Sequence, residues 1–199
     1  IFMSANRNTT RKRLDITVRA FSKFLETSSA AKDAYLHLHC GIVDMGMNVF
    51  DVVKRFGVEE RVITTGSVTG MQNISVELLN LYYNASDVGL NSSMGEGWGL
   101  TSVEHAVTGA PQIVPNHSAC AELFKDKALL IDSPTEFVFY ESTTVGNLAD
   151  YNDMAKCMAR YYYEPELRAQ HANAAMSFFL QEEFNWHKVA DKFVDEFIK

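Results

Sequence analysis

The 199-residue sequence is poor in cysteine and has neither a long apolar run nor a basic block. Its three cysteines are far apart and form no Cys-x-x-Cys pair, which excludes a zinc-ribbon or disulfide framework and predicts a reducing, cytoplasmic compartment. No apolar stretch approaches 18 residues, so we expect no transmembrane segment. The net charge of −7 without a Lys/Arg cluster argues against a nucleic-acid partner.

Several catalytic motifs are also missing. There is no Asp-x-Asp, so a metal-dependent, single-domain transferase is unsupported and no metal or other cofactor is expected. There is no G-x-x-x-x-G-K-[ST] phosphate loop and no G-x-S-x-G nucleophile elbow. These absences remove P-loop NTPases and α/β-hydrolases from the candidates.

What is present is an alternation of short apolar runs and amphipathic segments, which predicts an α/β fold with a doubly wound parallel sheet. The predicted strands are Ile1–Ala5, Ala34–Cys40, Arg61–Thr65, Val88–Asn91, Gln112–Pro115 and Ala128–Ile131. The predicted helices between them are Arg11–Thr27, Val49–Phe56, Val76–Ala85 and Thr101–Thr108. Residues 132–147 read as a loop, and three C-terminal helices follow over Leu148–Tyr163, Pro165–Leu180 and Trp186–Ile198.

The segment from Asn91 to Pro115 carries the strongest chemical signal. Gly95, Gly97 and Gly99 lie between a predicted strand and a helix that starts near Thr101. Glycines allow a ligand to approach the backbone, and the free N–H groups of a helix start bind phosphate. Glu96 and Glu104 flank this site and suit the hydroxyls of a nucleotide sugar, although such a pair is more often two surface carboxylates.

In this context the segment resembles the signature of family 4 glycosyltransferases. That signature is a Glu-Gly-Phe-Gly-Leu loop, a second Glu in the following helix, and Gly-x-Pro before the next strand; here Trp98 stands in place of the Phe. The resemblance implies that Glu104 accepts hydrogen bonds from the ribose. It further implies that Glu96 and the backbone of Gly97, Trp98, Gly99, Leu100 and Thr101 hold the donor sugar and its phosphate.

A second segment, Ser4–Asp15, extends the resemblance. Family members carry an Arg after the first strand and a Lys five positions later, which are Arg7 and Lys12 here. The resemblance implies that these cations stabilise the leaving diphosphate, so that Arg7, Lys12 and Glu96 form the catalytic set. Arg13 stands where Gly is usual, which leaves open whether Lys12 or Arg11 makes the main contact. The alternative is that these side chains are merely solvated.

The resemblance also sets the expected organisation and reaction. Residues 1–183 would be the Rossmann-like, donor-binding half of a GT-B fold, and the helix within 184–199 would pack towards an N-terminal acceptor domain that this chain lacks. The enzyme would transfer a hexosyl group, with retention, from a nucleotide sugar to a glycan or other acceptor. The run from Asn6 to Asp15 resembles members encoded by large algal viruses, which makes GDP-mannose the first guess for the donor.

Two other functions stay open, namely a non-catalytic nucleotide-sugar-binding module and a related GT-B enzyme such as an epimerase. Some residues also keep alternatives. His37 and His39 share a strand face and are half of a metal site or, more often, structural. His117 lines the donor pocket or, more often, caps a helix or lies at the surface. Glu122 starts a helix or contacts the ligand, and the base is expected near residues 66–70.

Overall fold

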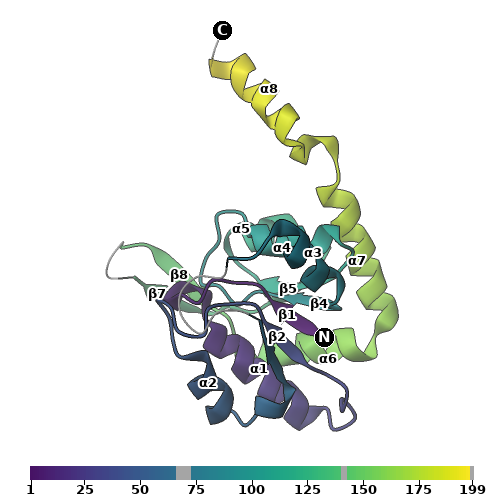
Figure 1. The fold of residues 1–199 in the computed structure, drawn as a ribbon. Helices are drawn as coiled ribbons and strands as arrows, with labels where there is room; N and C mark the ends of the chain where they lie inside the picture. Colours follow the sequence, from purple (N-terminus) through teal and green to yellow (C-terminus); the bar gives the residue numbers. More distant parts are fainter. Residues whose placement is uncertain (66–72, 140–142, 198–199) are drawn as a thin grey trace.

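The computed structural model describes residues 1–65, 73–139 and 143–197, and its centre is a parallel sheet of six strands (Figure 1). The strands are β1 (Phe2–Ser4), β2 (Leu36–Leu38), β3 (Val62–Thr64), β4 (Val88–Leu90), β5 (Gln112–Pro115) and β6 (Leu129–Ile131). Their order is β3-β2-β1-β4-β5-β6, so the chain winds outward from β1 in both directions. The predicted doubly wound fold is confirmed, and the base-binding prediction for residues 66–70 lies outside the described residues.

Helices cover both faces of the sheet and create two apolar cores (Figure 1). One face carries α1 (Leu14–Thr27), α2 (Val49–Arg55) and α6 (Tyr151–Tyr163). The other carries α3 (Val76–Asn84), α4 (Leu100–Val107), α5 (Ser118–Phe124) and α7 (Pro165–Phe179). Phe2, Phe21 and Phe24 form an edge-packed cluster in the first core, and Phe124 meets Phe179 in the second. Burial of the central strands on both faces explains why their sequences are mostly apolar.

The first helix begins later than predicted. Thr10–Lys12 form a separate 3₁₀ turn, η1, because Arg13 adopts a left-handed conformation with φ 48° and ψ 50°. The α-helix then starts at Leu14 instead of Arg11. This break places the side chains of the turn at the carboxyl edge of the sheet, where ligands bind in such folds.

The prediction of a loop over residues 132–147 is wrong. Thr135–Val138 (β7) and Val145–Leu148 (β8) pair antiparallel as a hairpin, which protrudes beyond the carboxyl edge of the main sheet (Figure 1). The sequence hid this hairpin because its side chains are mostly exposed and its strands lack the apolar runs of the core. Helix α6 consequently begins at Tyr151, capped by Asp150, instead of at Leu148.

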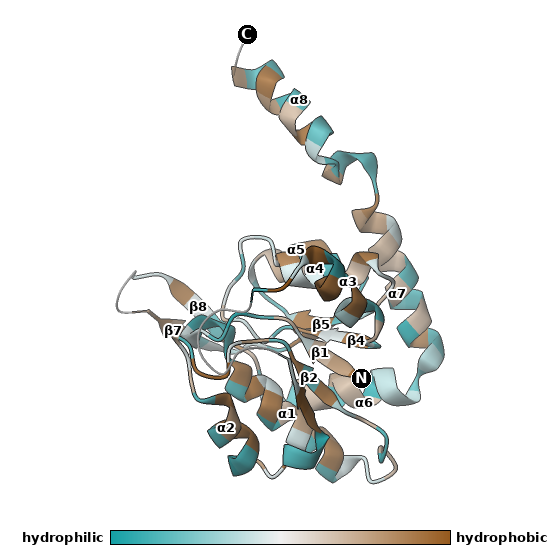
Figure 2. Ribbon diagram, viewed as in Figure 1, coloured by the Kyte–Doolittle hydropathy of each residue, from teal (hydrophilic) through white to brown (hydrophobic). Residues whose placement is uncertain are grey.

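The last helix, α8 (Trp186–Phe197), extends away from the body of the molecule (Figure 1). Hydrophobic and hydrophilic residues alternate around it (Figure 2), and none of its described residues is buried. A short 3₁₀ turn, η3 (Glu182–Phe184), connects it to α7. Among the described helices, none combines the length and apolarity that crossing a bilayer requires.

Candidate functional site

The candidate site lies where the strand order reverses, between β1 and β4. Two segments meet there, namely the η1 turn after β1 and the glycine-rich loop after β4. The amide of Met94 donates to the carbonyl of Arg11 over 2.8 Å. The hydroxyl of Ser92 donates to the carbonyls of Lys12 and Arg13, at 3.0 and 2.9 Å. These bonds lock the two segments together without a ligand.

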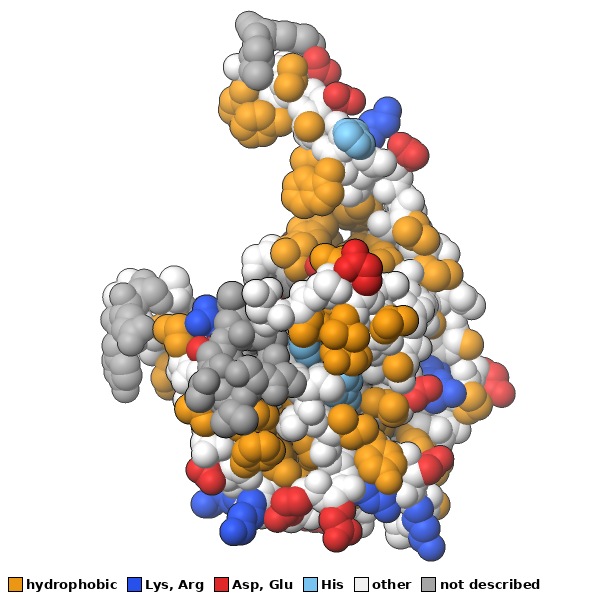
Figure 3. Space-filling model, in the orientation of Figure 1, with side chains coloured by type: hydrophobic (Ala, Val, Ile, Leu, Met, Phe, Trp, Pro, Cys, Tyr) orange, Lys and Arg blue, Asp and Glu red, His pale blue; other side chains and the backbone are white. Residues whose placement is uncertain are grey.

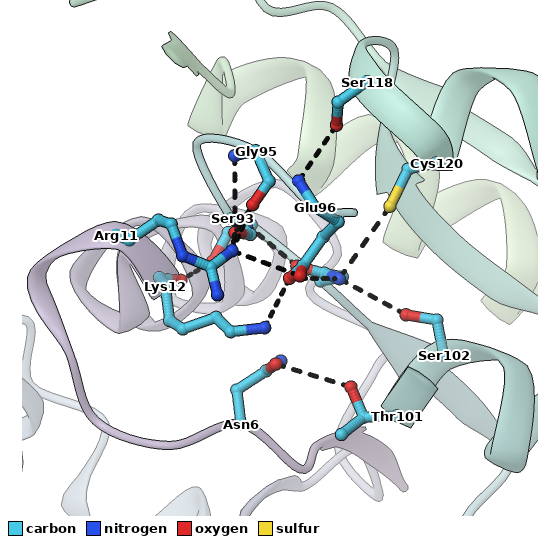
Figure 4. Close-up of polar contacts among 12 residues, drawn as sticks. Asn6, Arg11, Lys12, Ser93, Gly95, Glu96, Thr101, Ser102, Ser118 and Cys120 are labelled. Atoms are coloured by element: carbon cyan, nitrogen blue, oxygen red, sulfur yellow. Dashed lines mark hydrogen bonds and ion pairs between the residues drawn. The ribbon is translucent and has the colours of Figure 1, made fainter. Parts of the chain in front are cut away.

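Glu96 is the centre of this arrangement (Figure 4). Its side chain is only 7% exposed, and both carboxylate oxygens face cations from η1. Lys12 Nζ contacts Oε1, and Arg11 Nη1 lies 3.1 Å from Oε2. Asn91 Nδ2 lies 3.4 Å from Oε1, so the carboxylate is held from three directions. The structure therefore brings Glu96 and Lys12 together, as predicted for the site, and adds Arg11. The sequence left open whether Lys12 or Arg11 makes the main contact, and here both contact the carboxylate of Glu96.

The charges of this cluster decide its protonation state. Burial opposes ionisation of Glu96, but the charges and hydrogen bonds of Lys12 and Arg11 outweigh it and hold its pKa below the ordinary value. One carboxylate against two cations leaves the cluster with one excess positive charge. Such a site attracts an anion, and the nearby helix start adds to the attraction.

The loop after Glu96 leads directly into α4. Gly99 takes a left-handed conformation, with φ 81°, which turns the chain into the helix at Leu100, one residue before the predicted start. Among the described residues, the backbone N–H groups of residues 97–101 have no hydrogen-bond partner. Successive open N–H donors at a helix start can bind the oxygens of a phosphate or a sugar. The ring of Trp98 is 41% exposed and packs against Phe184, so it anchors the loop to the turn before α8.

Glu104 lies in the second turn of α4 and is exposed. Tyr83, from α3, donates its hydroxyl hydrogen to Oε2 of Glu104 over 3.0 Å. Beneath them, His105 stacks on the Tyr83 ring at 4.9 Å, and Nε2–H donates to the Tyr83 carbonyl over 3.1 Å. Glu104 thus has one oriented oxygen and remains accessible to a hydroxyl ligand.

Arg7 is placed differently from Lys12. Its guanidinium forms a two-point ion pair with Asp44, from Nε to Oδ2 at 2.9 Å and from Nη2 to Oδ1 at 3.3 Å. Asp44 follows β2, and its side chain is 7% exposed, whereas the Arg7 side chain is 45% exposed. No described contact joins Arg7 to Glu96. The structure therefore separates two members of the catalytic set that the resemblance implied.

The histidines have mostly structural partners. His37 Nε2 and His39 Nδ1 share the hydroxyl of Thr65, at 2.6 and 3.1 Å, and both rings contact Tyr82. The described residues contain no group of three metal-ligating side chains. His117 precedes α5 but makes no side-chain cap, so the capping alternative is wrong; its Nε2 is buried without a described partner.

The sequence interpretation missed several polar side chains around Glu96. Ser118 accepts the Glu96 amide over 3.1 Å from the start of α5, and it takes a strained left-handed φ of 52° to do so. Asn6 accepts the Thr101 hydroxyl over 3.4 Å. Glu122 lies inside α5 instead of starting it. The alternative of a helix start at Glu122 placed a helix in the right region but four residues too late, because α5 begins at Ser118.

Comparison with known proteins identifies the family. The model of a family described as family 4 glycosyltransferase in conflict systems matches residues 2–193. The chain belongs to this glycosyltransferase family. No curated protein matches it in sequence.

The fold of this glycosyltransferase chain also matches solved structures. A complex of a TarM mutant from S. aureus with fondaparinux, alpha-GlcNAc-glycerol and UDP has a TM-score of 0.75 at 14% identity, covering 100% of this chain and 35% of that one. Sucrose-phosphate synthase from Thermosynechococcus elongatus also scores 0.75, at 19% identity, covering 99% and 44%. The C-terminal domain of a group 1 glycosyl transferase (LpcC) from Francisella tularensis scores 0.69 at 15% identity, covering 91% and 84%.

These matches confirm the Rossmann-like domain of GT-B glycosyltransferases. At such low identity the likeness concerns the fold alone. The chain spans less than half the length of the first two proteins, so the activity of a whole protein is taken up as a proposal below.

Proposed function

We propose that this domain binds a nucleoside-diphosphate sugar and serves as the donor half of a hexosyltransferase. The observation that carries the proposal is the glycine loop with its row of open N–H groups, beside a carboxylate that two cations hold. Open amides and excess positive charge suit a diphosphate, and oriented carboxylates suit sugar hydroxyls. Both occur at the topological switch point, where doubly wound folds bind nucleotides.

The proposed roles follow from these positions. Residues 97–101 donate backbone hydrogen bonds to the phosphate and sugar, and Glu96 accepts from a sugar hydroxyl while Lys12 balances the diphosphate charge. Glu104 accepts from the ribose, with Tyr83 fixing its other oxygen. Arg7 keeps its proposed place beside the diphosphate, although its Nε and Nη2 are engaged by Asp44 in the structure. Catalysis would come from positioning and from stabilising the leaving group.

The finer assignments are GDP-mannose as donor, retention at the anomeric carbon, and a glycan or other acceptor. All three rest on the family resemblance. We also propose that a second domain supplies the acceptor site and that α8 packs towards it, since α8 exposes Trp186, Phe193 and Phe197. A domain boundary at residues 183 and 184 falls within η3, next to the exposed helix.

We further propose that fixed cations, without a metal, neutralise the leaving diphosphate in a reducing, cytoplasmic compartment. Lys12 and its neighbours supply the charge. The three cysteines are buried and form no disulfide within the described residues, which suits a reducing environment. A transfer assay with the full-length protein checks the first point: activity that EDTA abolishes and a divalent cation restores would contradict it.

The test of the function is calorimetric titration with GDP, UDP, ADP and their sugar derivatives. One nucleotide family should bind, and Glu104→Ala should weaken it by about 1–3 kcal/mol because the ribose hydroxyls lose their acceptor. Glu166→Ala removes another exposed carboxylate, at the start of α7, and should leave binding unchanged. If no nucleotide binds, the proposal is wrong. Binding without transfer by the full-length protein would favour the non-catalytic module instead.

A further inference from the structure

Two arginines follow β1, and they differ in which edge of the guanidinium is occupied. Arg7 and Arg11 have similar exposure, 45% and 43%, so accessibility does not separate them. Arg7 commits Nε and Nη2, the pair of donors that form a two-point contact with an oxyanion, to the two oxygens of Asp44. Nη2 of Arg7 also contacts Met45 Sδ at 3.5 Å, so Nη1 is the one side-chain nitrogen of Arg7 that has no hydrogen-bond partner among the described residues.

Arg11 has the opposite arrangement. All of its described hydrogen bonds come from one nitrogen, Nη1, which contacts Ser93 Oγ at 2.9 Å, the Gly95 carbonyl, and Glu96 Oε2 at 3.1 Å. Within residues 1–65, 73–139 and 143–197, Nε and Nη2 have no hydrogen-bond partner. Arg11 thus presents an unused two-donor edge, which a phosphate oxygen pair fits.

The surroundings keep this edge in place. The carbonyl of Arg11 accepts the Met94 amide, while its side chain is tied to Ser93 and Gly95 in the same loop (Figure 4). Both ends of the residue are therefore fixed to the segment that bears the open N–H groups. A cation that is already oriented loses little freedom when an anion binds.

The charges agree with this assignment. The pair of Arg7 and Asp44 is neutral, whereas Arg11, Lys12 and Glu96 together carry one excess positive charge. A diphosphate approaching the loop meets this excess charge without breaking any ion pair. A two-point contact through Nε and Nη2 of Arg7 would require separating the pair with Asp44, which leaves Nη1 for a single contact.

We propose that Arg11 is the principal arginine that binds the diphosphate of the donor, with Arg7 contributing less. The assignment rests on the proposed function and deepens it, because it changes which side chain stabilises the leaving group. It also gives a reason for the compact η1 turn, which holds Arg11 and Lys12 next to Glu96.

The experiment measures dissociation constants of GDP, UDP and inorganic pyrophosphate for the native chain and four variants, by calorimetry. Arg11→Gln should weaken the nucleoside diphosphate that binds by roughly 10–100-fold, because two charge-assisted hydrogen bonds are lost. Arg11→Lys keeps the positive charge but lacks the paired donors of the guanidinium, so its dissociation constant should lie between those of the native chain and Arg11→Gln. Arg7→Gln should weaken binding less than Arg11→Gln, and Arg55→Gln, on α2, controls for the loss of one charge.

A second readout separates binding from folding. The corresponding nucleoside, which has no phosphate, should bind Arg11→Gln as it binds the native chain, as followed by NMR shift changes. Equal loss of nucleoside and diphosphate binding would show a structural role and overturn the assignment. So would a larger loss for Arg7→Gln than for Arg11→Gln. If the native chain binds no nucleoside diphosphate, the proposed function itself is wrong. If the native chain binds one but the Arg11 variants behave as just described, only the assignment of Arg11 is wrong.

Discussion

At the scale of single residues, Glu96 shows how a nearly buried carboxylate becomes part of a binding site. Its two cations come from a segment more than 80 positions earlier in the chain, so the contact exists only in the folded protein. Because those cations lower its pKa, the carboxylate stays ionised at neutral pH. Its contribution to stability is present above the pKa of the unfolded chain and is lost as the pH falls through the lower, folded-state pKa.

Glu96→Gln should lower the free energy of unfolding by about 1–3 kcal/mol at pH 7, because a neutral amide leaves two neighbouring cations without compensation. The measurement is urea unfolding. Glu164→Gln is the matched control, since its partner Arg160 is about half exposed, and we expect a loss of about 0.5 kcal/mol or less. Equal losses in the two variants would contradict a structural role for the Glu96 cluster. The difference between native and Glu96→Gln should shrink below pH 4.

Two buried histidines predict a different pH dependence. Burial lowers the pKa of His37 and of His105 to about 4. Below pH 6.5 these two histidines are protonated in the unfolded chain but stay neutral in the folded chain. The free energy of unfolding therefore falls as the pH drops from 6.5 towards 4. From pH 7 to pH 5 each histidine should account for a loss of about 2 kcal/mol. His105→Gln should reduce the total loss by that amount in urea unfolding. An imidazole NMR titration with a midpoint near 6.5 for His105 would contradict this.

At the scale of elements, the break between η1 and α1 depends on one unusual backbone conformation. Arg13 is left-handed, where a side chain costs roughly 1–2 kcal/mol relative to the right-handed conformation. Its ion pair with Asp15, at 2.9 and 2.6 Å, offsets part of that cost. Gly at this position, as the resemblance leads one to expect, would meet the same turn without strain.

Arg13→Gly should therefore be more stable than Arg13→Ala by about 1 kcal/mol. Both variants lose the ion pair with Asp15, so their difference isolates the backbone. The comparison needs only the two thermal or urea unfolding curves. If alanine proved as stable as glycine, residue 13 would not be left-handed in solution, and the separation of η1 from α1 would be wrong.

The β7–β8 hairpin is held against the glycine-rich loop after β4 by close backbone contact. The amide of Asn147 donates to the Met94 carbonyl over 3.0 Å, and a Cβ on Gly146 would lie 2.6 Å from the same oxygen. Gly146→Ala should thus destabilise the protein by about 1–3 kcal/mol and shift the loop. Gly95→Ala is the matched control, because a Cβ there meets nothing within 4 Å. Similar stability of the two variants would argue against this contact.

The elements that the sequence predicts well are those whose burial fixes their composition. Each predicted strand of the main sheet contains the observed one, because a short apolar run in an alternating chain suits a buried parallel strand. The exposed hairpin has no such signature. Likewise, the residue types near Glu96 were predictable from the glycine loop and the resemblance. The pairing of Arg7 with Asp44 was not, because it depends on how two loops meet.

At the scale of the whole molecule, one body contains both cores and one helix lies outside it. Hydrophobic side chains gather along α8 in the space-filling view (Figure 3), and Trp186, Phe193 and Phe197 are 79%, 61% and 74% exposed. An apolar helix face of this kind marks an interaction surface. In contrast, Phe184 in the preceding turn packs on Phe178 and Phe179, so the body ends with that residue.

Deleting residues 185–199 should therefore leave the free energy of unfolding of the body within about 1 kcal/mol of the native value, because no described side chain of α8 is buried. Deletion from residue 181 onward also removes Phe184 and should lower the free energy of unfolding of the body. The loss should be smaller than the roughly 3–5 kcal/mol expected for a fully buried phenylalanine, because Phe184 is only partly buried. The shorter deletion should also reduce self-association in sedimentation experiments, since the exposed apolar stripe is gone. If it instead lowered the stability of a monomeric chain by several kcal/mol, α8 would pack on this domain in solution and would not be available to a second one.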